Sequence, residues 1–229
     1  PEARHAVSVG RARVGEQLAI GNGAGLIVRG PVTHAEIAEL RLEVRAVEST
    51  PRPNPGIWLA QALAKGDRDE LAIQAATELG VDGVIPWAAS RSVSRWEGTK
   101  VAKGRERWSA IVREASKQSV RAWLPEVGAL VNTKQLAALA PAADIVVLDP
   151  LSADPICQFA RTFARTDISD SHASVADPQQ PRDIVLVVGP EGGIAPHELE
   201  LLYMAGAIGA RLGDTILRTS TAGPAAIAV

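Results

Sequence analysis

The sequence contains few of the residues that build metal sites or disulfides. Its 229 residues include one cysteine, Cys157, and four histidines. A lone cysteine excludes an intrachain disulfide and a cysteine cluster for zinc, and the histidines show no spacing typical of metal ligands. We therefore expect no metal site, and we expect Cys157 to pack in a helix and not to act as a nucleophile.

Long apolar runs are also absent. No stretch of about eighteen apolar residues occurs, and the first residues lack the charged-then-apolar order of an export signal. We therefore expect no membrane span, and a cytoplasmic protein is the simplest expectation. The hydrophobic content of 46% is sufficient for a core, and the length fits one large domain or two modest ones.

Acidic and basic residues nearly balance but are unevenly distributed. The formal net charge of −2 would argue against nucleic-acid binding if the charges were spread evenly. Between residues 91 and 121, however, nine basic residues stand against three acidic ones, an excess of +6. Apolar residues at three- and four-residue spacing predict an amphipathic helix over residues 101–119. Its basic face is either solvated or in contact with RNA.

The first part of the chain differs in pattern from the rest. Short strand-like segments punctuated by glycines predict a small β-rich module over residues 1–50. These segments cover residues 17–20, 26–29 and 41–47. A proline-rich spacer at residues 50–56 then predicts a domain boundary.

From Ile57 onward, strands and helices alternate, which indicates a parallel sheet with helical crossovers. Asp67 and Glu70 suggest a capping box that opens a helix ending at Gly80, with Leu71, Ala75 and Leu79 on one face. Further strands are expected at residues 83–87, 144–149, 184–188 and 207–212. A helix is expected at residues 196–205, and a mobile surface loop at residues 166–183.

A glycine-rich loop, Gly189 to Gly193, follows the buried-type strand at residues 184–188. Ligands of open α/β sheets bind outside the carboxyl ends of strands, so this loop is either a ligand site or a tight turn without a ligand. It matches neither of the two common phosphate-binding patterns. Glu191 would repel phosphate and suits a ligand that offers hydroxyls, an amine or a positive centre.

A second loop, rich in hydroxyl groups, covers residues 213–222. Ser220 and Thr221 are candidate helix caps. Arg218 lies between apolar and small residues, where an arginine usually requires a partner.

Together, GPEGG after a buried strand and LGDTILRTSTA about twenty residues later resemble the RsmE family of SPOUT-class methyltransferases. The segments KGDRDELAIQAATELGVDGVIPWAASRSV and EASKQSVRAWLPEV also match the family, so the resemblance covers nearly the whole chain. It implies S-adenosylmethionine-dependent methylation of N3 of a uridine in 16S ribosomal RNA. Free RNA and the small ribosomal subunit both remain possible substrates.

The resemblance implies an α/β fold in two domains. Residues 1–50 would form a PUA-like β-barrel that binds RNA, and residues 57–229 a SPOUT-type parallel sheet with a C-terminal trefoil knot. The knot loops would bind the methyl donor and pair two subunits in a homodimer. The implied donor-binding residues are Leu148, Gly189, Pro190, Glu191, Gly192, Gly193, Leu212, Gly213, Ile216, Leu217, Arg218 and Thr219.

The sequence also departs from the family pattern. Asp214, Thr215 and Ser220 replace the usual residues, so no catalytic role is assigned to them. The first barrel strand would be missing before His5 and the last helix cut at Val229, which would weaken RNA binding and association.

Methylation at uracil N3 requires loss of the N3 proton. Arg218 is the candidate that stabilises the charge developing on the uracil oxygens, and Glu191 is a weaker candidate for the base or for positioning the donor. Two alternatives remain: a non-catalytic PUA-like RNA-binding protein whose knot-like loops hold a ligand, and a dinucleotide-dependent oxidoreductase.

Overall fold

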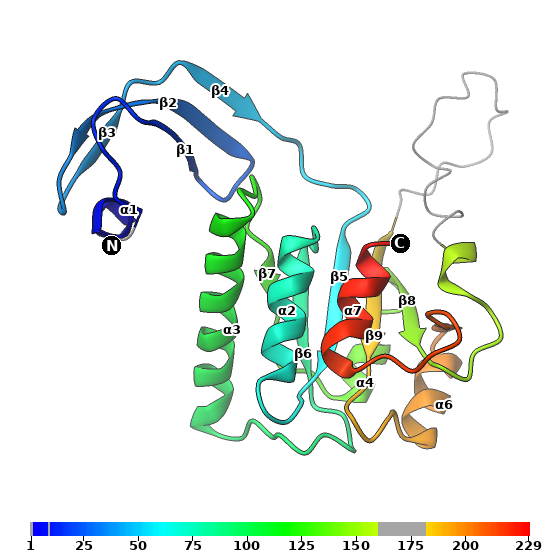
Figure 1. Cartoon of the computed structure of the whole chain (residues 1–229). Coiled ribbons are helices and arrows are strands. Elements are labelled where there is room, and N and C mark those ends of the chain that lie inside the picture. Colours follow the sequence, from blue (N-terminus) through cyan, green and yellow to red (C-terminus); the bar gives the residue numbers. More distant parts are fainter. Residues whose placement is uncertain (1, 9, 160–181) are drawn as a thin grey trace, which may run out of the picture. The chain divides into compact units, whose positions relative to one another are not determined.

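The computed structural model describes residues 2–8, 10–159 and 182–229 (Figure 1). The chain divides into two compact units. One comprises Pro1–Arg52 and Ser119–Leu124, and the other comprises Pro53–Gln118 and Pro125–Val229. Most of the expected surface loop at residues 166–183 lies outside the described residues.

The first unit is built on an antiparallel sheet. Its strands are β1 (Gln17–Gly21), β2 (Leu26–Ala35), β3 (Leu40–Leu42) and β4 (Ala46–Ser49), and a short helix, α1 (Glu2–Ser8), precedes them. The long strand β2 pairs with β1, β3 and β4. The single strand expected at residues 41–47 is wrong, because β3 and β4 pair with different parts of β2. The chain between them crosses at Gly30, where any side chain would collide with the Glu43 carbonyl oxygen.

The segment Ser119–Leu124 joins this unit although it follows the boundary expected from the proline-rich spacer. Trp123 donates its indole N–H to the carbonyl oxygen of Thr50 at 2.9 Å. The guanidinium of Arg52 lies 5.9 Å from the centre of the Trp123 ring. A side chain at Gly25 would strike the same ring, so the indole fills the space that the glycine leaves.

The second unit contains a six-stranded sheet in the order β10-β8-β9-β5-β6-β7, and each neighbouring pair is parallel. The expected α/β fold with a parallel sheet is therefore confirmed. Its strands are β5 (Ile57–Ala62), β6 (Gly83–Trp87), β7 (Glu126–Val127), β8 (Ala143–Leu148), β9 (Asp183–Val188) and β10 (Ile208–Ala210). The last strand is shorter than the expected 207–212.

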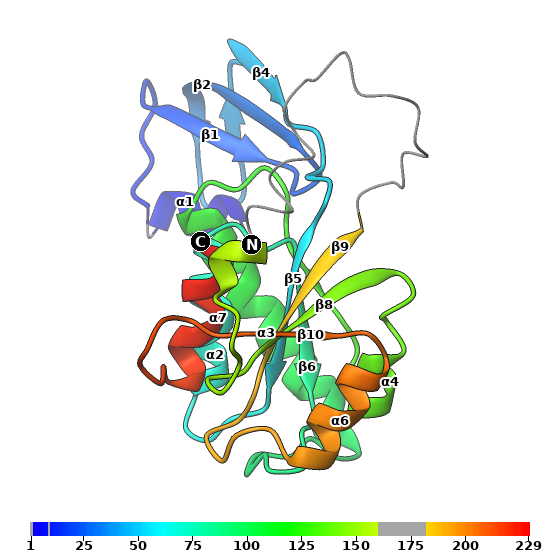
Figure 2. The same cartoon turned by 90° about the vertical axis from the view of Figure 1, so that its right-hand side faces the viewer.

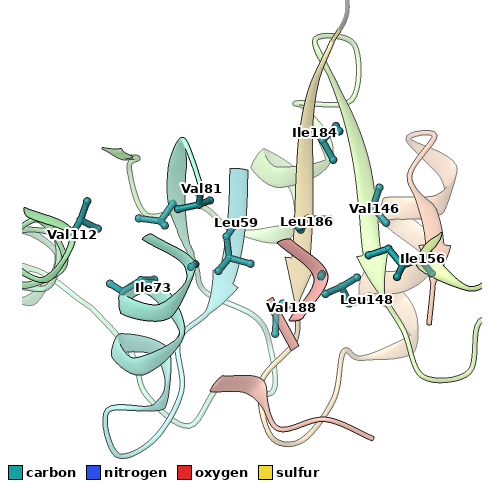
Figure 3. Close-up of a cluster of buried hydrophobic side chains, with 14 of the residues drawn as sticks. Leu59, Ile73, Val81, Val112, Val146, Leu148, Ile156, Ile184, Leu186 and Val188 are labelled. Atoms are coloured by element: carbon teal, nitrogen blue, oxygen red, sulfur yellow. The ribbon is translucent and has the colours of Figure 1, made fainter. Parts of the chain in front are cut away.

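Helices cover both faces of this sheet (Figure 2). They are α2 (Arg68–Glu78), α3 (Thr99–Gln118), α4 (Thr133–Ala137), α6 (Pro196–Met204) and α7 (Thr219–Ile227). The helices α2, α3 and α7 pack with Leu59 and Leu186 in one core cluster (Figure 3). On the opposite face, α4 and α6 pack against Ala60 and Val187. Burial of these apolar surfaces stabilises the unit.

The amphipathic interpretation succeeded for α3 and failed for α2. In α3, Trp108, Val112 and Ala115 are buried as expected. In α2, Leu71 and Leu79 are 57% and 49% exposed. The buried side of α2 is formed by small residues and one isoleucine, namely Ala72, Ile73, Ala76 and Thr77. The small residues allow close approach to the sheet, a reason that hydrophobicity alone does not reveal.

Two local expectations are also wrong. Asp67 adopts a left-handed conformation with φ of 59° and makes no capping hydrogen bond through its side chain. Instead, Asp69 accepts hydrogen bonds from the N–H groups of Ala64 and Glu70. Cys157 is exposed and so does not contribute to a packed helix interior.

Candidate active site

A cavity of about 1080 Å³ opens where β8, β9 and β10 reach their carboxyl ends. The loops that follow these three strands form its walls, as expected for a ligand site in an open α/β sheet. Every residue that the family resemblance assigns to donor binding lines it. These residues are Leu148, Gly189, Pro190, Glu191, Gly192, Gly193, Leu212, Gly213, Ile216, Leu217, Arg218 and Thr219.

The glycine loop forms one wall of this cavity and is tightly turned. The N–H of Gly193 donates to the carbonyl oxygen of Pro190 at 2.9 Å, and Gly193 has a φ of 72°. A side chain at Gly193 would therefore be strained. Gly192 is different, because a Cβ there would lie 3.5 Å from the nearest atom, on Arg91. A Cβ at Gly192 would therefore make ordinary contact with Arg91 and no clash.

Glu191 is held in place by a neighbouring arginine. The Arg68 guanidinium donates to the Glu191 carboxylate at 2.8 Å. The backbone N–H of Lys65 donates to the same carboxylate at 3.2 Å. Partial burial alone would raise the pKa of Glu191, but the hydrogen bonds from its own N–H, Arg68 and Lys65 outweigh it and lower the pKa below 4.5. A carboxylate with these partners is a weak base, so its geometry favours a positioning role.

A second support of the glycine loop comes from the segment after β6. The Arg91 guanidinium donates to the carbonyl oxygen of Gly192 at 3.1 Å. The preceding residue, Ser90, donates through its N–H and its hydroxyl to Glu198, at 3.0 and 2.7 Å. Glu198 also accepts from Thr133 at 2.6 Å and from the N–H of Ala195 at 3.3 Å. Its side chain therefore anchors the Ser90–Arg91 segment and the start of α6 together.

The pKa of Glu198 follows from these contacts. The residue is only 3% exposed. Burial by itself would raise the pKa, but the hydrogen bonds from Thr133, Ser90 and Ala195 outweigh it and hold the pKa below 4.5. Sequence analysis assigned Glu198 to the first turn of a helix and missed this anchoring role. The sequence held one signal for a role of the Ser90–Arg91 segment, because both residues lie in a stretch that matches the family.

The second loop, residues 212–218, forms the other wall. Arg211 and Asp214 are paired at 2.6 Å, and Arg211 also donates to the carbonyl oxygen of Ala153 at 3.3 Å. Ile216 is 82% exposed although it is apolar. Gly213 takes a φ of 70°. This wall is therefore open to solvent over much of its length.

Arg218 lies at the end of this loop, as the residue that precedes α7. The other arginines that line the cavity, Arg68, Arg91 and Arg211, all bind an acceptor of the protein. Within the described ranges 2–8, 10–159 and 182–229, the Arg218 guanidinium has no such partner. It is exposed and available to an anion in the cavity.

Thr219, the first residue of α7, connects the two walls. Its hydroxyl donates to the carbonyl oxygen of Gly189 at 2.8 Å and accepts from the Gln61 amide at 2.9 Å. Sequence analysis did not single out Gln61, although a glutamine in an otherwise apolar strand was a signal. The suggested caps Ser220 and Thr221 are wrong, because both residues lie inside α7 and Arg218 occupies the capping position.

In the part of the chain that the structure describes, no group of three or more His, Cys, Asp or Glu residues could hold a metal ion. None of the described helices is long and apolar enough to cross a membrane.

Known proteins match this sequence over nearly the whole chain. Residues 51–229 match the RNA methyltransferase domain family. Ribosomal RNA small subunit methyltransferase E from Mycobacterium bovis is 41% identical over 231 residues, covering 99% of this chain and 82% of the relative.

Solved structures also resemble the whole chain, and two of them contain the methyl donor. One is ribosomal RNA small subunit methyltransferase E from Neisseria gonorrhoeae bound to S-adenosyl methionine, with a TM-score of 0.77, 28% identity and coverage of 99% and 87% of the two chains. The other is a methyltransferase from Legionella pneumophila with bound S-adenosylmethionine, with a TM-score of 0.78, 28% identity and coverage of 98% and 86%. The sequence match across nearly the full length and the shared fold show that the chain belongs to the ribosomal RNA small subunit methyltransferase E family.

Proposed function

We propose that this protein uses S-adenosylmethionine to methylate N3 of a uridine in 16S ribosomal RNA. The observation that carries the proposal is the cavity at the ends of β8, β9 and β10. Residues from three separate strand ends line it, and so does Arg218, whose guanidinium has no protein partner within the described part of the chain. Relatives that share the fold bind this methyl donor.

The cavity fits the chemistry of S-adenosylmethionine. Its volume of about 1080 Å³ is at the upper end of what small-ligand sites provide. Leu148, Leu212 and Leu217 offer apolar contact for an adenine ring, while Asp149 and Glu191 suit the amino group and the sulfonium charge. Gly192 lines the cavity without a side chain, so a ligand can approach its backbone closely. When bound, the donor supplies an electrophilic methyl group.

Arg218 is the proposed catalytic residue. Uracil N3 becomes nucleophilic as its proton leaves, and negative charge then develops on the O2 and O4 oxygens. A guanidinium with no protein partner can donate hydrogen bonds to one of these oxygens, and a fixed donor of this kind stabilises the transition state. Water or RNA groups would then accept the proton.

Glu191 is proposed as a positioning residue. Its carboxylate accepts from Arg68, the first residue of α2, and from the N–H of Lys65 before it, so it holds the glycine loop against the start of this helix. Its lowered pKa keeps it ionised at neutral pH. An anion fixed at this point favours the positively charged donor.

The finer features of the family complete the proposal. The first unit would be a PUA-like barrel for RNA, the C-terminal strands and loops would form a trefoil knot, and the enzyme would act in the cytoplasm. A homodimer is supported by two exposed apolar residues at the cavity, Leu151 and Ile216, which are 93% and 82% exposed. Exposed apolar side chains that gather at one site, as these two do at the cavity, are typical of an interaction surface.

The direct test is methyl transfer. Purified protein would be incubated with labelled S-adenosylmethionine in two separate reactions. One would contain free 16S RNA, and the other would contain small subunits that lack the modification. Mass mapping of nucleosides should reveal 3-methyluridine. Binding of both donor and RNA without any transfer would instead support a non-catalytic RNA-binding protein, and failure to bind the donor would overturn the proposal.

The basic face of α3 provides a separate test of RNA contact. Lys100, Lys103 and Arg113 are exposed and lack an ion pair among the described residues, whereas Arg107 pairs with Glu70 and Asp67. Reversal of the first three to glutamate should lower RNA affinity and flatten its salt dependence, by about 0.7–0.9 in slope for each phosphate that the variant no longer binds. Replacing Arg107 with glutamine is the control. An unchanged slope in the triple variant would show that this face is only solvated.

A further inference from the structure

We infer that Gln61 is a positioning residue that fixes the two walls of the cavity relative to each other through the hydroxyl of Thr219. The role of those walls in donor binding rests on the proposed function. Gln61 itself does not line the cavity, so it would act through Thr219 and not through contact with the donor.

Gln61 occupies a place where an apolar residue would be expected. It lies in β5 with no exposed surface, and alternate residues of a strand share a face, so Leu59 and Leu63 flank it on the same side. Both leucines belong to the core cluster beneath α2 and α7. A polar side chain in such surroundings lowers stability unless its hydrogen-bonding groups are paired.

The amide of Gln61 is only partly paired. Its nitrogen donates to the carbonyl oxygen of Ala62 at 3.2 Å and to the Thr219 hydroxyl at 2.9 Å. The reverse orientation of the amide would set two oxygens against each other at Ala62, so the nitrogen must face these acceptors. The oxygen Oε1 is buried and has no hydrogen-bond partner among the residues that the structure describes. An apolar residue would avoid this unfavourable group, so stability alone does not explain the glutamine.

The hydrogen bonds run in one direction, from the Gln61 amide to the Thr219 hydroxyl and from that hydroxyl to Gly189. A threonine hydroxyl has a single hydrogen, and that of Thr219 goes to the carbonyl oxygen of Gly189 at 2.8 Å. The hydroxyl must therefore accept a hydrogen bond from Gln61. The amide nitrogen of Gln61 can only donate, so it fixes the hydroxyl in this orientation. Gly189 begins the glycine loop, while Thr219 directly follows Arg218. One buried hydroxyl, oriented by Gln61, thus joins the wall proposed to hold the donor to the residue proposed for catalysis.

The test compares Gln61→Met, which keeps the length of the side chain but cannot donate, with Thr219→Val and Thr219→Ser. Thermal unfolding, backbone hydrogen exchange in the absence of ligand and affinity for S-adenosylmethionine by calorimetry would be measured for each. In Gln61→Met, we expect an unchanged or higher unfolding temperature, faster exchange in residues 189–193 and 218–222, and affinity weaker by about tenfold. Thr219→Val should show the same faster exchange and weaker affinity. The double variant, Gln61→Met with Thr219→Val, should exchange no faster and bind no more weakly than either single variant. Thr219→Ser, which keeps the hydroxyl, should retain the wild-type exchange rates in both loops.

Ser116→Ala is the matched control, since Ser116 is also buried with an unpaired hydroxyl but lies on α3. It should change neither the exchange of the two loops nor the affinity. Unchanged exchange in Gln61→Met, or additive losses in the double variant, would overturn the inference. A lower unfolding temperature with unchanged loop exchange would show that Gln61 is merely structural. If the wild-type protein binds no donor, the proposed function fails, while the exchange data still decide the role of Gln61.

Discussion

The two walls of the cavity are built in different ways. The glycine loop is held from outside by three other elements: Arg68 binds Glu191, Arg91 binds Gly192, and Thr219 binds Gly189. The second loop depends mainly on the ion pair between Arg211 and Asp214, which are three residues apart. The Asp214 side chain is 93% exposed, so solvent weakens that pair.

This difference separates two tasks. A loop fixed by several distant partners keeps its geometry before a ligand arrives, and such preorganisation lowers the entropy lost on binding. A loop with local contacts can adapt when the ligand and the RNA enter. Under the proposed function, the glycine loop would define where the donor binds, and the second loop would bring Arg218 to the reacting base.

The largest effect is expected from removing the one cation of the second wall that has no protein partner among the described residues. Arg218→Ala should lower the rate of methyl transfer by about 10²–10³, or roughly 3–4 kcal/mol, because a fixed oxyanion donor is lost. Single-turnover assays would measure it, with circular dichroism to verify folding. Arg211→Ala, in the same wall, is the control and should lose much less. Near-normal turnover of Arg218→Ala, or loss of its fold, would make Arg218 structural.

The next effect concerns the fixed wall. Gly192→Val should weaken S-adenosylmethionine binding by about tenfold or more, since its branched side chain would project from a residue that lines the cavity. Gly192→Ala should change the unfolding temperature little, because its Cβ would lie at ordinary contact distance from Arg91. Calorimetry across Gly192→Ala and Gly192→Val should show a graded loss. Equal affinity in all three proteins would mean that the donor lies elsewhere.

Hydrogen exchange tests the contrast between the walls directly. Saturating S-adenosylmethionine should slow exchange in residues 212–217 more than in residues 189–194, because a loop that is already ordered has less freedom to lose. A severalfold difference in protection is expected. The reverse order would show that the glycine loop is the adaptable wall.

The smallest effect is a pH-dependent one at Glu191. Its pKa in the folded protein lies below 4.5, so its ionised form stabilises the fold above that pH, and this contribution is lost as pH falls through the folded-state pKa. Glu191→Gln should thus lower the unfolding temperature by a few degrees or less at pH 7, and the difference should vanish in strong acid. Arg68→Met should reproduce this behaviour, whereas a pH-independent difference would exclude the ion pair as its cause.

The sequence predicted the two walls of the cavity better than the contacts that hold them in place. Strand ends and glycines mark where a chain can hold a ligand, and both loops of the cavity were found in this way. The contacts that fix them were not predicted: Gln61 and Thr219 are 158 residues apart, and Ser90 and Glu198 are 108 apart. Such pairs depend on strand order, which local patterns do not encode. The exposed face of α2 was mispredicted for a related reason, because close packing against the sheet favours small residues over leucines.

The position of Trp123 has a consequence for the order in which this protein can be completed during synthesis. The first unit takes its last residues from Ser119–Leu124, after the chain has already built β5, α2, β6 and α3. The indole that fills the space at Gly25 therefore leaves the ribosome only after these four elements of the second unit have been made. Until Trp123 has been made, the space beside Gly25 in the first unit stays unfilled. A chain cut after Arg52 would lack this indole altogether.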